Sequence, residues 1–300
     1  MKPPRSRRPL WNRFLVGSFV LGLGLTTGLW TTGCLPSPDD THTKLVITGS
    51  STVAPLVSEI AKRYEAEHPG VRIDVQTGGS SRGIADARNG TAHLGMISRD
   101  LKDDEQDLQA ATIARDGVGL IVHRDNPIDD LDADQVAAIY RGEIQNWSEL
   151  AGPDGEIDGD ITVVNKAEGR ATLEVFKKFF GLESPEIEAD VIIGHNEQGI
   201  KTVAGNAHSI GYVSIGVAES DIQAGVSIRL PSINGIKAST ATVADGSFPV
   251  ARPLNLVFPA KPQLAPDIRR FLDYCRSNTV HDLIQDQYFV PSLPVSSPDA

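Results

Sequence analysis

The sequence predicts an α/β protein built on a mostly parallel sheet with helices on both faces. Three observations lead to this expectation. Short apolar runs typical of strands recur along the chain, glycine- and serine-containing loops follow them, and segments with apolar residues at helical spacing come next. Strands that alternate with helices usually lie parallel, because the helical crossover returns the chain to the same end of the sheet. Of the 300 residues, 40% are hydrophobic and 22% charged, which is typical of globular proteins.

The first strand and helix illustrate the pattern. The run Lys44–Thr48 (KLVIT) is apolar and β-branched, so it is expected to be a strand. Ser51 or Thr52 can cap the helix that follows, because hydroxyl side chains accept hydrogen bonds from the first backbone N–H groups. Apolar residues then recur at helical spacing from Val53 to Tyr64, and His68-Pro69-Gly70 ends the helix.

The remaining elements carry the same signals. Val71–Gln76 alternates like a strand, Val118–His123 is a continuous apolar run, and Thr172–Phe180 carries aromatic residues on one helical face. Pro266 suits the first turn of a helix, where no backbone N–H is missed. In chain order, further strands are expected at 93–97, 161–165, 209–214 and 252–258, and helices at about 83–89, 134–140 and 266–278.

A basic head and an uncharged apolar stretch open the chain. Residues 1–33 hold five basic side chains and no acidic one, and Phe14–Trp30 is uncharged, which is the layout of an export signal. Thr32-Gly33 before Cys34 resembles a bacterial lipoprotein cleavage box. We expect residues 1–33 to be a signal peptide, Cys34 to carry lipid, and residues 34–43 to be a tether. A retained membrane anchor and plain secretion are the alternatives.

The charge balance limits the partners of the mature chain. The formal net charge is −11, and removing residues 1–33 leaves 23 basic against 39 acidic side chains, a net charge of −16. Nucleic-acid binding is therefore not expected, since affinity for a phosphate backbone depends on a cationic surface. Any anion must be held by local donors.

Four loops contain such donors. Each follows a predicted strand and begins a helix, where unpaired backbone N–H groups and the helix dipole favour an oxyanion. For each loop alone, ordinary helix capping is the alternative. Because such loops converge at the carboxyl ends of the strands, the four together predict a site for a small tetrahedral anion. The loops are 49–52 (GSST), 79–81 (GSS), 97–99 (ISR) and 166–172 (KAEGRAT).

Other chemistry finds weaker support. Residues 79–83 match the G-x-S-x-G nucleophile elbow, with His208 or His281 as candidate partners, but too few strands precede it for an α/β-hydrolase and no HGGG-like segment is present. The seven histidines are scattered without metal-ligand spacing, so no metal site is expected. Tyr140 and Trp147 suggest either an aromatic platform for a ligand or core packing, and core packing is favoured.

A family resemblance covers nearly the whole mature chain, from about Lys44 to Pro291. The sequence resembles the periplasmic phosphate-binding proteins of ABC transporters, the PstS-like family of solute-binding proteins. Single blocks are weak signals, but their order and spacing together are specific. The blocks are GSSTVAPL at 49–56, GGSSRGI at 78–84, ISRDLKDDE at 97–105, ARDGVGLIVHRDNP at 114–127, IYRGEIQNWSEL at 139–150, IGYVSIG at 210–216 and FPVARPLNLV at 248–257.

The resemblance also implies anion ligands in the first three loops. They fall on Ser51 and Thr52 in the first loop, on Ser80 in the second, and on Ser98 in the third, with Arg99 beside it. Asp100 would be one candidate carboxylate acceptor for the phosphate proton.

The fourth loop departs from the family pattern. The family usually has an arginine and then Ser-Gly-Thr after a glycine, whereas this chain has Lys166 and then Arg170, Ala171 and Thr172 after the glycine. Only Thr172 matches. Lysine is not equivalent to arginine at a bidentate site, so Arg170 either restores the guanidinium from a new position or alters the ligand preference. Glu168 is the second candidate acceptor.

The resemblance implies a two-lobed, type II-like periplasmic-binding-protein fold with mixed, mostly parallel sheets and two hinge crossovers, near Val122 and Ala251. Lobe one would comprise residues 44–121 plus 248–291, lobe two residues 122–247, and residues 292–300 a flexible tail. Hinge motion would close the lobes around the ligand.

The implied function is extracytoplasmic binding of inorganic phosphate and its delivery to an ABC transporter permease. The protein would be a monomer anchored by lipid to a bacterial membrane, with no enzymatic activity and no cofactor. Another oxyanion (sulfate, tungstate or a phosphate ester) is the alternative ligand, and a serine hydrolase the remote alternative activity.

Overall fold

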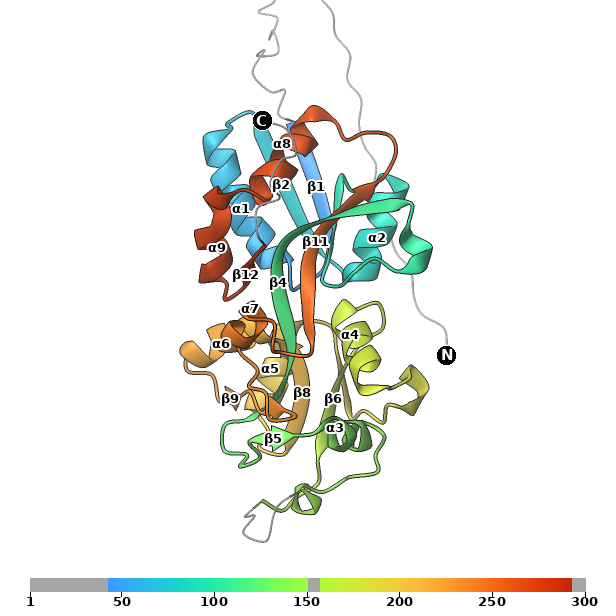
Figure 1. Cartoon of the computed structure of the whole chain (residues 1–300), viewed down its shortest axis with the longest axis vertical. Coiled ribbons are helices and arrows are strands. Elements are labelled where there is room, and N and C mark those ends of the chain that lie inside the picture. Colours follow the sequence, from blue (N-terminus) through green and yellow to red (C-terminus); the bar gives the residue numbers. More distant parts are fainter. Residues whose placement is uncertain (1–42, 151–156, 293–300) are drawn as a thin grey trace, which may run out of the picture. The chain divides into compact units, whose positions relative to one another are not determined.

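The computed structural model describes residues 43–150 and 157–292. The expected signal peptide, the lipidated Cys34, and nearly all of the expected tether and tail lie outside these residues. The chain forms an α/β fold on a mixed sheet with the strand order β2-β1-β3-β11-β4-β8-β6-β7, and β9 and β12 also pair with β4. Figure 1 shows two lobes that share the long strands β4 and β11. The predicted α/β class with two lobes is confirmed.

Lobe one contains β1, β2, β3 and β12 and one half each of β4 and β11. Strands β1, β2 and β3 are mutually parallel, and β11 lies antiparallel between β3 and β4. The strand bounds are β1 Thr43–Gly49, β2 Val71–Thr77, β3 Leu94–Ile97, β4 Leu108–His123, β11 Ala251–Pro259 and β12 Val290–Pro291.

Lobe two contains the remaining strands. Strand β8 pairs antiparallel with β4, and β6 lies parallel to both β8 and β7. Two short strands, β5 and β10, pair with each other outside the main sheet. The bounds are β5 Asp130–Leu131, β6 Thr162–Lys166, β7 Val191–Ile193, β8 Ser209–Ser214, β9 Ile228–Arg229 and β10 Ser232–Ile233.

The strand directions bring the functional loops of both lobes to one place. In lobe one β3 runs antiparallel to β11, so its carboxyl end points toward the start of β11, although Ile97 itself pairs with Asn255 in the middle of that strand. In lobe two the carboxyl end of β8, at Ser214, pairs with Val118 of β4, close to the point where β4 leaves β11. The carboxyl ends of the parallel strands in both lobes therefore point toward the junction between the lobes.

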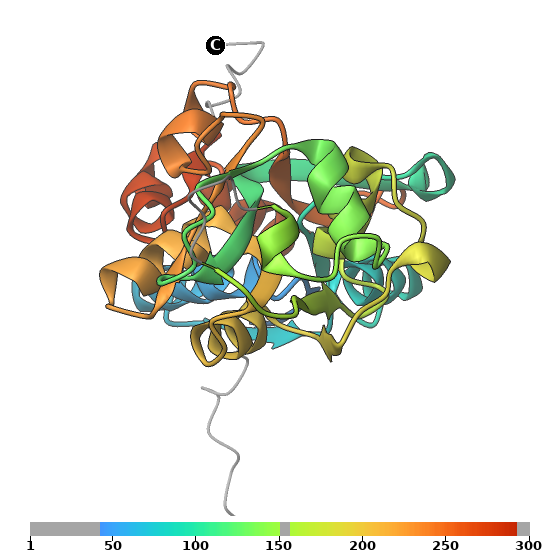
Figure 2. The same ribbon diagram turned by 90° about the horizontal axis from the view of Figure 1, so that it is seen from below.

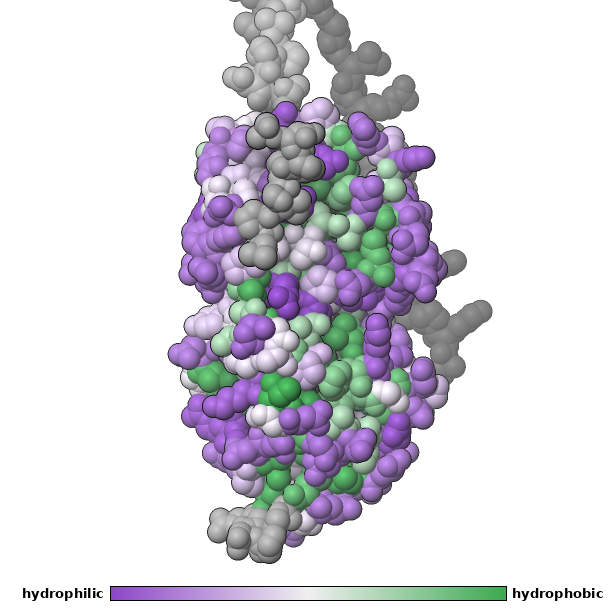
Figure 3. All heavy atoms as spheres, viewed as in Figure 1, coloured by the Kyte–Doolittle hydropathy of each residue, from purple (hydrophilic) through white to green (hydrophobic). Residues whose placement is uncertain are grey.

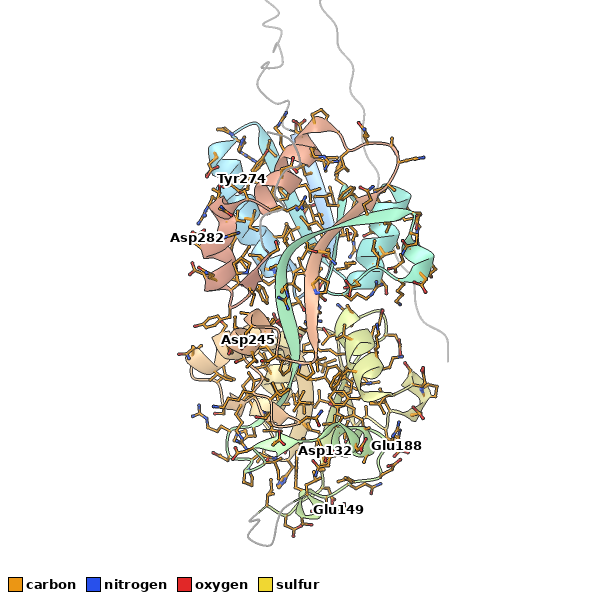
Figure 4. The ribbon with its side chains drawn as sticks, in the orientation of Figure 1. Asp132, Glu149, Glu188, Asp245, Tyr274 and Asp282 are labelled. Carbon is orange, nitrogen blue, oxygen red and sulfur yellow. The ribbon has the colours of Figure 1, made fainter. Side chains whose placement is uncertain are left out.

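Helices cover both faces of the sheet in lobe one. Helices α1, α8 and α9 pack on one face around Leu56, Ile60 and Phe271, and the shorter α2 packs on the other through Ile84. Figure 4 labels Tyr274 of α8 and Asp282 at the start of α9. The Tyr274 hydroxyl donates to Glu67, and Asp282 accepts from Arg63, so both bonds tie these helices to α1. The bounds are α1 Ala54–Glu67, α2 Ser80–Asn89, α8 Pro266–Cys275 and α9 His281–Asp286.

Lobe two is covered in the same way. One face packs against α3 and α4, where the ring of Phe176 stacks on that of Tyr212 at 3.8 Å, and the other face packs against α5 and α6. Figure 2, the view from below, shows these helices around the strands of the lobe. Tyr140 and Trp147 are fully buried in the first of these cores, so the prediction of core packing is confirmed. The bounds are α3 Ala133–Tyr140, α4 Ala171–Phe180, α5 Asn196–Ala204, α6 Ile215–Gln223 and α7 Thr240–Ala244.

Short 3-10 helices occupy several connections between these elements. Among the described residues they are Asp103–Glu105, Trp147–Glu149, Ser184–Glu186 and Asn278–Val280. The last of these is separate from α8, which ends at Cys275. The helix expected at 266–278 is therefore three residues longer than α8, because residues 276–278 belong to the connection.

The long strand β4 is the main difference from the predicted elements. The sequence predicts a strand at Val118–His123, whereas β4 begins at Leu108 and runs from one lobe into the other. It exchanges β11 for β8 as its partner between Gly117 and Val118, ahead of the crossover expected near Val122. Because β4 continues through the junction between the lobes, its sequence has no turn or break there. The change of pairing partner from β11 to β8 therefore cannot be predicted from the local sequence.

Hydrophilic residues cover most of the periphery of the face in Figure 3, and apolar residues show mainly toward its middle. Within residues 43–150 and 157–292, no helix combines the length and the apolar character needed to cross a membrane.

Candidate anion-binding site

A small polar cavity lies where the loops of the two lobes meet. Its volume is about 10 Å³, roughly the space for one water molecule, so the groups that line it lie close together. Lobe one and lobe two each contribute six of its lining residues. These are Ser50, Ser51, Thr52, Gly79, Ser80 and Ser98 from lobe one, and Lys166, Arg170, Ala171, Thr172, Gly194 and Asn196 from lobe two.

Buried hydroxyl groups form the wall that belongs to lobe one. Ser50 Oγ donates to Ser98 Oγ at 3.1 Å, and Ser80 Oγ accepts from the Ser98 backbone N–H at 3.2 Å. Ser50, Thr52, Ser80 and Ser98 are each at most 3% exposed. Such groups need partners, because an unpaired buried hydroxyl costs about 1–3 kcal/mol.

These hydroxyls do not cap the helices that follow them. Helix α1 begins at Ala54 after Val53 and has no side-chain cap, so the expectation that Ser51 or Thr52 caps it is wrong. Helices α2 and α4 also begin without a side-chain cap. The first N–H groups of three helices are thus free of side-chain acceptors beside the cavity, which is the arrangement that favours an anion.

Gly79 allows the loops of the two lobes to approach each other. Its φ of +96° lies in the left-handed region, and a Cβ atom there would come within 2.8 Å of the Gly169 carbonyl oxygen. The Ser81 backbone N–H donates to the same oxygen at 3.3 Å. The second and fourth predicted loops therefore meet directly.

The wall that belongs to lobe two carries the positive charges. Lys166 ends β6 and is 3% exposed, and its ammonium donates to Asn196 Oδ1 at 3.0 Å. Asn196 Nδ2 in turn donates to Thr52 Oγ1 at 3.2 Å, which joins the two walls. Arg170 lines the cavity as well, and its Nη1 is buried without a hydrogen-bond partner among the described residues.

Arg252 of β11 lies directly behind these groups, although sequence analysis did not single it out. Its Nη1 donates to Thr172 Oγ1 at 2.9 Å and to Ser98 Oγ at 3.4 Å, so one guanidinium bonds to hydroxyls of both lobes. Its Nη2 reaches Thr52 Oγ1 at 3.5 Å.

Asp116 of β4 holds this guanidinium in place. Its Oδ2 accepts from Arg252 Nε at 3.2 Å and from Nη2 at 2.9 Å, and both side chains are 1% exposed. The Gly216 backbone N–H donates to the other carboxylate oxygen at 3.3 Å. A buried ion pair needs such additional bonds to offset its desolvation. The pair fixes one edge of the guanidinium and leaves Nη1 to the hydroxyls.

Arg99 lies outside the cavity. Its guanidinium donates to Glu105 at 2.7 and 2.8 Å, and its Nε is 2.9 Å from a Glu174 oxygen of α4, an ion pair without hydrogen-bond alignment. Ser98, its neighbour, does line the cavity. The other eight side chains expected as ligands, Ser51, Thr52, Ser80, Ser98, Lys166, Arg170, Ala171 and Thr172, are brought together there.

The two candidate carboxylate acceptors also lie elsewhere. Asp100 is exposed, and Glu168 accepts a hydrogen bond from Ser184 Oγ at 2.6 Å. Among the residues that line the cavity, all within the described ranges, none is aspartate or glutamate. The site therefore presents almost entirely donors and hydroxyls.

The residues of the G-x-S-x-G segment line the cavity and form a contact between the lobes. Ser80 lines the cavity, whereas the exposed Ser81 uses its backbone N–H to bond Gly169. His208, a candidate partner, packs its ring beside Gly159 and accepts from Trp147 through its carbonyl. In the described part of the chain no hydrogen bond joins the Ser81 side chain to a histidine, the type of base that would activate such a nucleophile.

Sequence reasoning missed Arg252, Asp116 and Asn196. Asn196 follows β7 at the start of α5, so it has the same strand–loop–helix signal as the predicted loops, but β7 is only three residues long. Arg252 could have been found by a different signal, since it is a charged residue within a mostly apolar strand. A charge that is buried in such a strand needs a partner of opposite charge.

The fold and the cavity are those of a two-lobed ligand-binding protein, and comparison with known proteins agrees. A family model described as a PBP superfamily domain matches residues 36–279. A crystal structure of a putative phosphate ABC transporter substrate-binding protein with bound phosphate from Clostridium perfringens is 30% identical, with a TM-score of 0.76, and is matched over 84% of this chain and 100% of its own.

Two further relatives support the same assignment. An ABC-type phosphate transport receptor from Vibrio cholerae is 25% identical with a TM-score of 0.68, over 83% of this chain and 100% of its own. The phosphate-binding protein PstS of Bacillus subtilis is 28% identical over 252 residues, 82% of this chain and 80% of that protein. The chain belongs to the PBP superfamily, in the PstS-like family of substrate-binding proteins.

Proposed function

We propose that this protein binds inorganic phosphate in the cavity between its lobes and delivers it to the permease of an ABC transporter. The observation that carries the proposal is the buried guanidinium of Arg252, which converges with hydroxyls of both lobes beside three uncapped helix N-termini. This donor set suits an anion with oxygens in several directions. The phosphate bound to the Clostridium perfringens relative supports the same ligand.

The local donors explain how an acidic protein would bind an anion. Without residues 1–33 the chain carries a net charge of −16, so long-range attraction does not recruit the ligand. Lys166, Arg170 and Arg252 supply positive charge at short range, where a low-dielectric environment strengthens each contact. Asp116 neutralises only part of that charge.

The expected partners follow from the family. The chain would act outside the cytoplasm as a monomer, held to a bacterial membrane by lipid on Cys34, and would catalyse no reaction. Metabolic labelling with a fatty acid, compared between the native chain and a Cys34→Ser variant, tests the anchor. Labelling that is unchanged in the variant would contradict it.

Isothermal titration tests the ligand. The native chain without residues 1–34 is titrated with phosphate, arsenate, sulfate and tungstate at one ionic strength. We expect phosphate to bind with a Kd at or below the micromolar range, with arsenate close to it because of its similar shape and protonation. Tight binding of sulfate or tungstate with only millimolar phosphate affinity would favour the alternative of another oxyanion. Tighter binding of a phosphate ester than of phosphate, in the same titration, would favour the ester.

A further inference from the structure

Lys166 is a buried lysine that has no carboxylate partner in the cavity. Its side chain is fixed by an amide oxygen, Asn196 Oδ1, at 3.0 Å, and its backbone N–H donates to the Tyr212 hydroxyl at 3.3 Å. An amide oxygen can accept a hydrogen bond from an amine as well as from an ammonium, so this contact does not require the charged form. The side chain can therefore stay in place in either protonation state.

The charged groups around Lys166 mostly oppose its ionisation. Arg252 of β11 and Arg170 before α4 are both cationic and face it, whereas Glu197 of α5 is the acidic group that favours its charge. Tyr212 of β8 contributes only a neutral hydroxyl, because burial raises its pKa well above the usual range. Burial first, and then repulsion from Arg252, lowers the pKa of Lys166 to about 7.

We propose that an anion enters this site together with a proton on Lys166, so that the bound pair is a lysine ammonium facing a dibasic anion. The proposal rests on the proposed phosphate function and adds the ionisation state that the site selects. A dianion beside Nζ favours the ammonium, because opposite charges within a few ångströms attract strongly in a buried site.

The proton has a defined source and destination. Above neutral pH the Nζ lone pair takes a proton from solvent as dibasic phosphate binds. Below neutral pH Lys166 is already mostly an ammonium, so monobasic phosphate gives up its proton to solvent: its O–H bond breaks, the proton goes to water or buffer, and the bound pair is again ammonium and dianion. No electrons are exchanged in either route.

The affinity for phosphate is expected to fall as the pH rises above neutral. Between about pH 8 and pH 9.5 free phosphate is already dibasic. Free Lys166 is then mostly uncharged, because its pKa of about 7 lies below this window. Each binding event therefore takes up one proton, and the affinity falls about tenfold for each pH unit. An arginine at this position stays charged throughout and gives no such slope.

The experiment measures the phosphate Kd across this pH window for the native protein and three variants. We expect a tenfold loss per pH unit in the native protein and a flat profile in Lys166→Arg. Lys166→Met should bind weakly at all pH values, with the native affinity approaching it as the pH rises. Lys201→Met, which removes an exposed lysine from α5, is the matched control and should retain the native slope.

A second measurement needs no variant. Titration of the native protein with phosphate at about pH 8.5, in two buffers of different ionisation enthalpy, gives the number of protons taken up; one proton supports the proposal, and none overturns it. A slope that persists in both Lys166 variants would place the proton on another group and also overturn it. Tight phosphate binding with a flat native profile overturns this proposal alone, whereas no phosphate binding at any pH overturns the proposed function and this proposal with it.

Discussion

The two walls of the cavity hold an anion by different means. Lobe one presents only neutral donors, the hydroxyls of Ser50, Thr52, Ser80 and Ser98 with nearby backbone N–H groups. Lobe two presents the cations Lys166 and Arg170. Arg252, on a strand that both lobes share, bonds to hydroxyls of each. Charge and hydrogen-bond geometry are therefore supplied by different parts of the chain, which makes their contributions separable by mutation.

The largest expected effect comes from removing the shared guanidinium. Arg252→Met deletes the bonds to Thr172 and Ser98 and leaves Asp116 as an uncompensated buried charge. We expect stability to fall by about 3–5 kcal/mol and phosphate affinity by on the order of 100-fold or more. Urea denaturation and isothermal titration measure the two effects.

A double variant separates those two effects. Arg252→Met with Asp116→Leu removes both charges of the pair, so stability should recover while affinity stays low. Arg229→Met, at a partly buried arginine that pairs with an exposed carboxylate, is the control and should bind normally. Full affinity in the double variant would show that Arg252 supports the fold and does not bind the anion.

A smaller effect is expected from the neutral wall. Thr52→Val and Ser80→Ala each remove one buried hydroxyl, and each should weaken phosphate binding by about 1–3 kcal/mol. Ser81→Ala, at the exposed neighbour, should leave the Kd unchanged. If Thr52→Val and Ser80→Ala also leave it unchanged, the assignment of lobe one to anion binding is wrong, and any ester hydrolysis abolished by Ser81→Ala would revive the hydrolase alternative.

The smallest effect is expected from an ion pair between the lobes outside the cavity. Glu174 of α4 lies 2.9 Å from Arg99 Nε and 2.7 Å from Lys102 Nζ, both of lobe one. Glu174→Gln should weaken phosphate binding by roughly 1 kcal/mol, less at high salt, because it loosens the contact between the lobes. Titration at two salt concentrations measures this. A Kd unaffected at low salt would show that the pair does not assist closure.

The loops at the strand ends could be predicted because each carries a local signal. Around Thr52, Ser80, Ser98 and Thr172 the sequence shows a strand, then a small polar loop, then the start of a helix or turn. The sheet topology then brings these loops together at the carboxyl ends of the strands. The parallel arrangement was predictable for the same reason, whereas the two lobes were expected from the family resemblance.

The parts that could not be predicted depend on contacts distant in sequence. Asp116 and Arg252 are 136 residues apart, and no sequence pattern near either residue predicts that the two pair with each other. Arg99 shows the converse: its place beside Ser98 suggests a ligand, but its side chain does not line the cavity. Glu105, six residues further on, then binds its guanidinium.

The position of Arg252 on β11 has a consequence for the rates of binding. If the lobes rotate about this strand, as the family resemblance implies, Arg252 would move little and would be oriented toward an arriving anion before closure. Association should then depend on Arg252 and the hydroxyls of one lobe, while the residence time should depend on contacts made only after closure, such as those of Thr172 and Glu174. Substitutions across the cavity from each other would thus act on different rate constants.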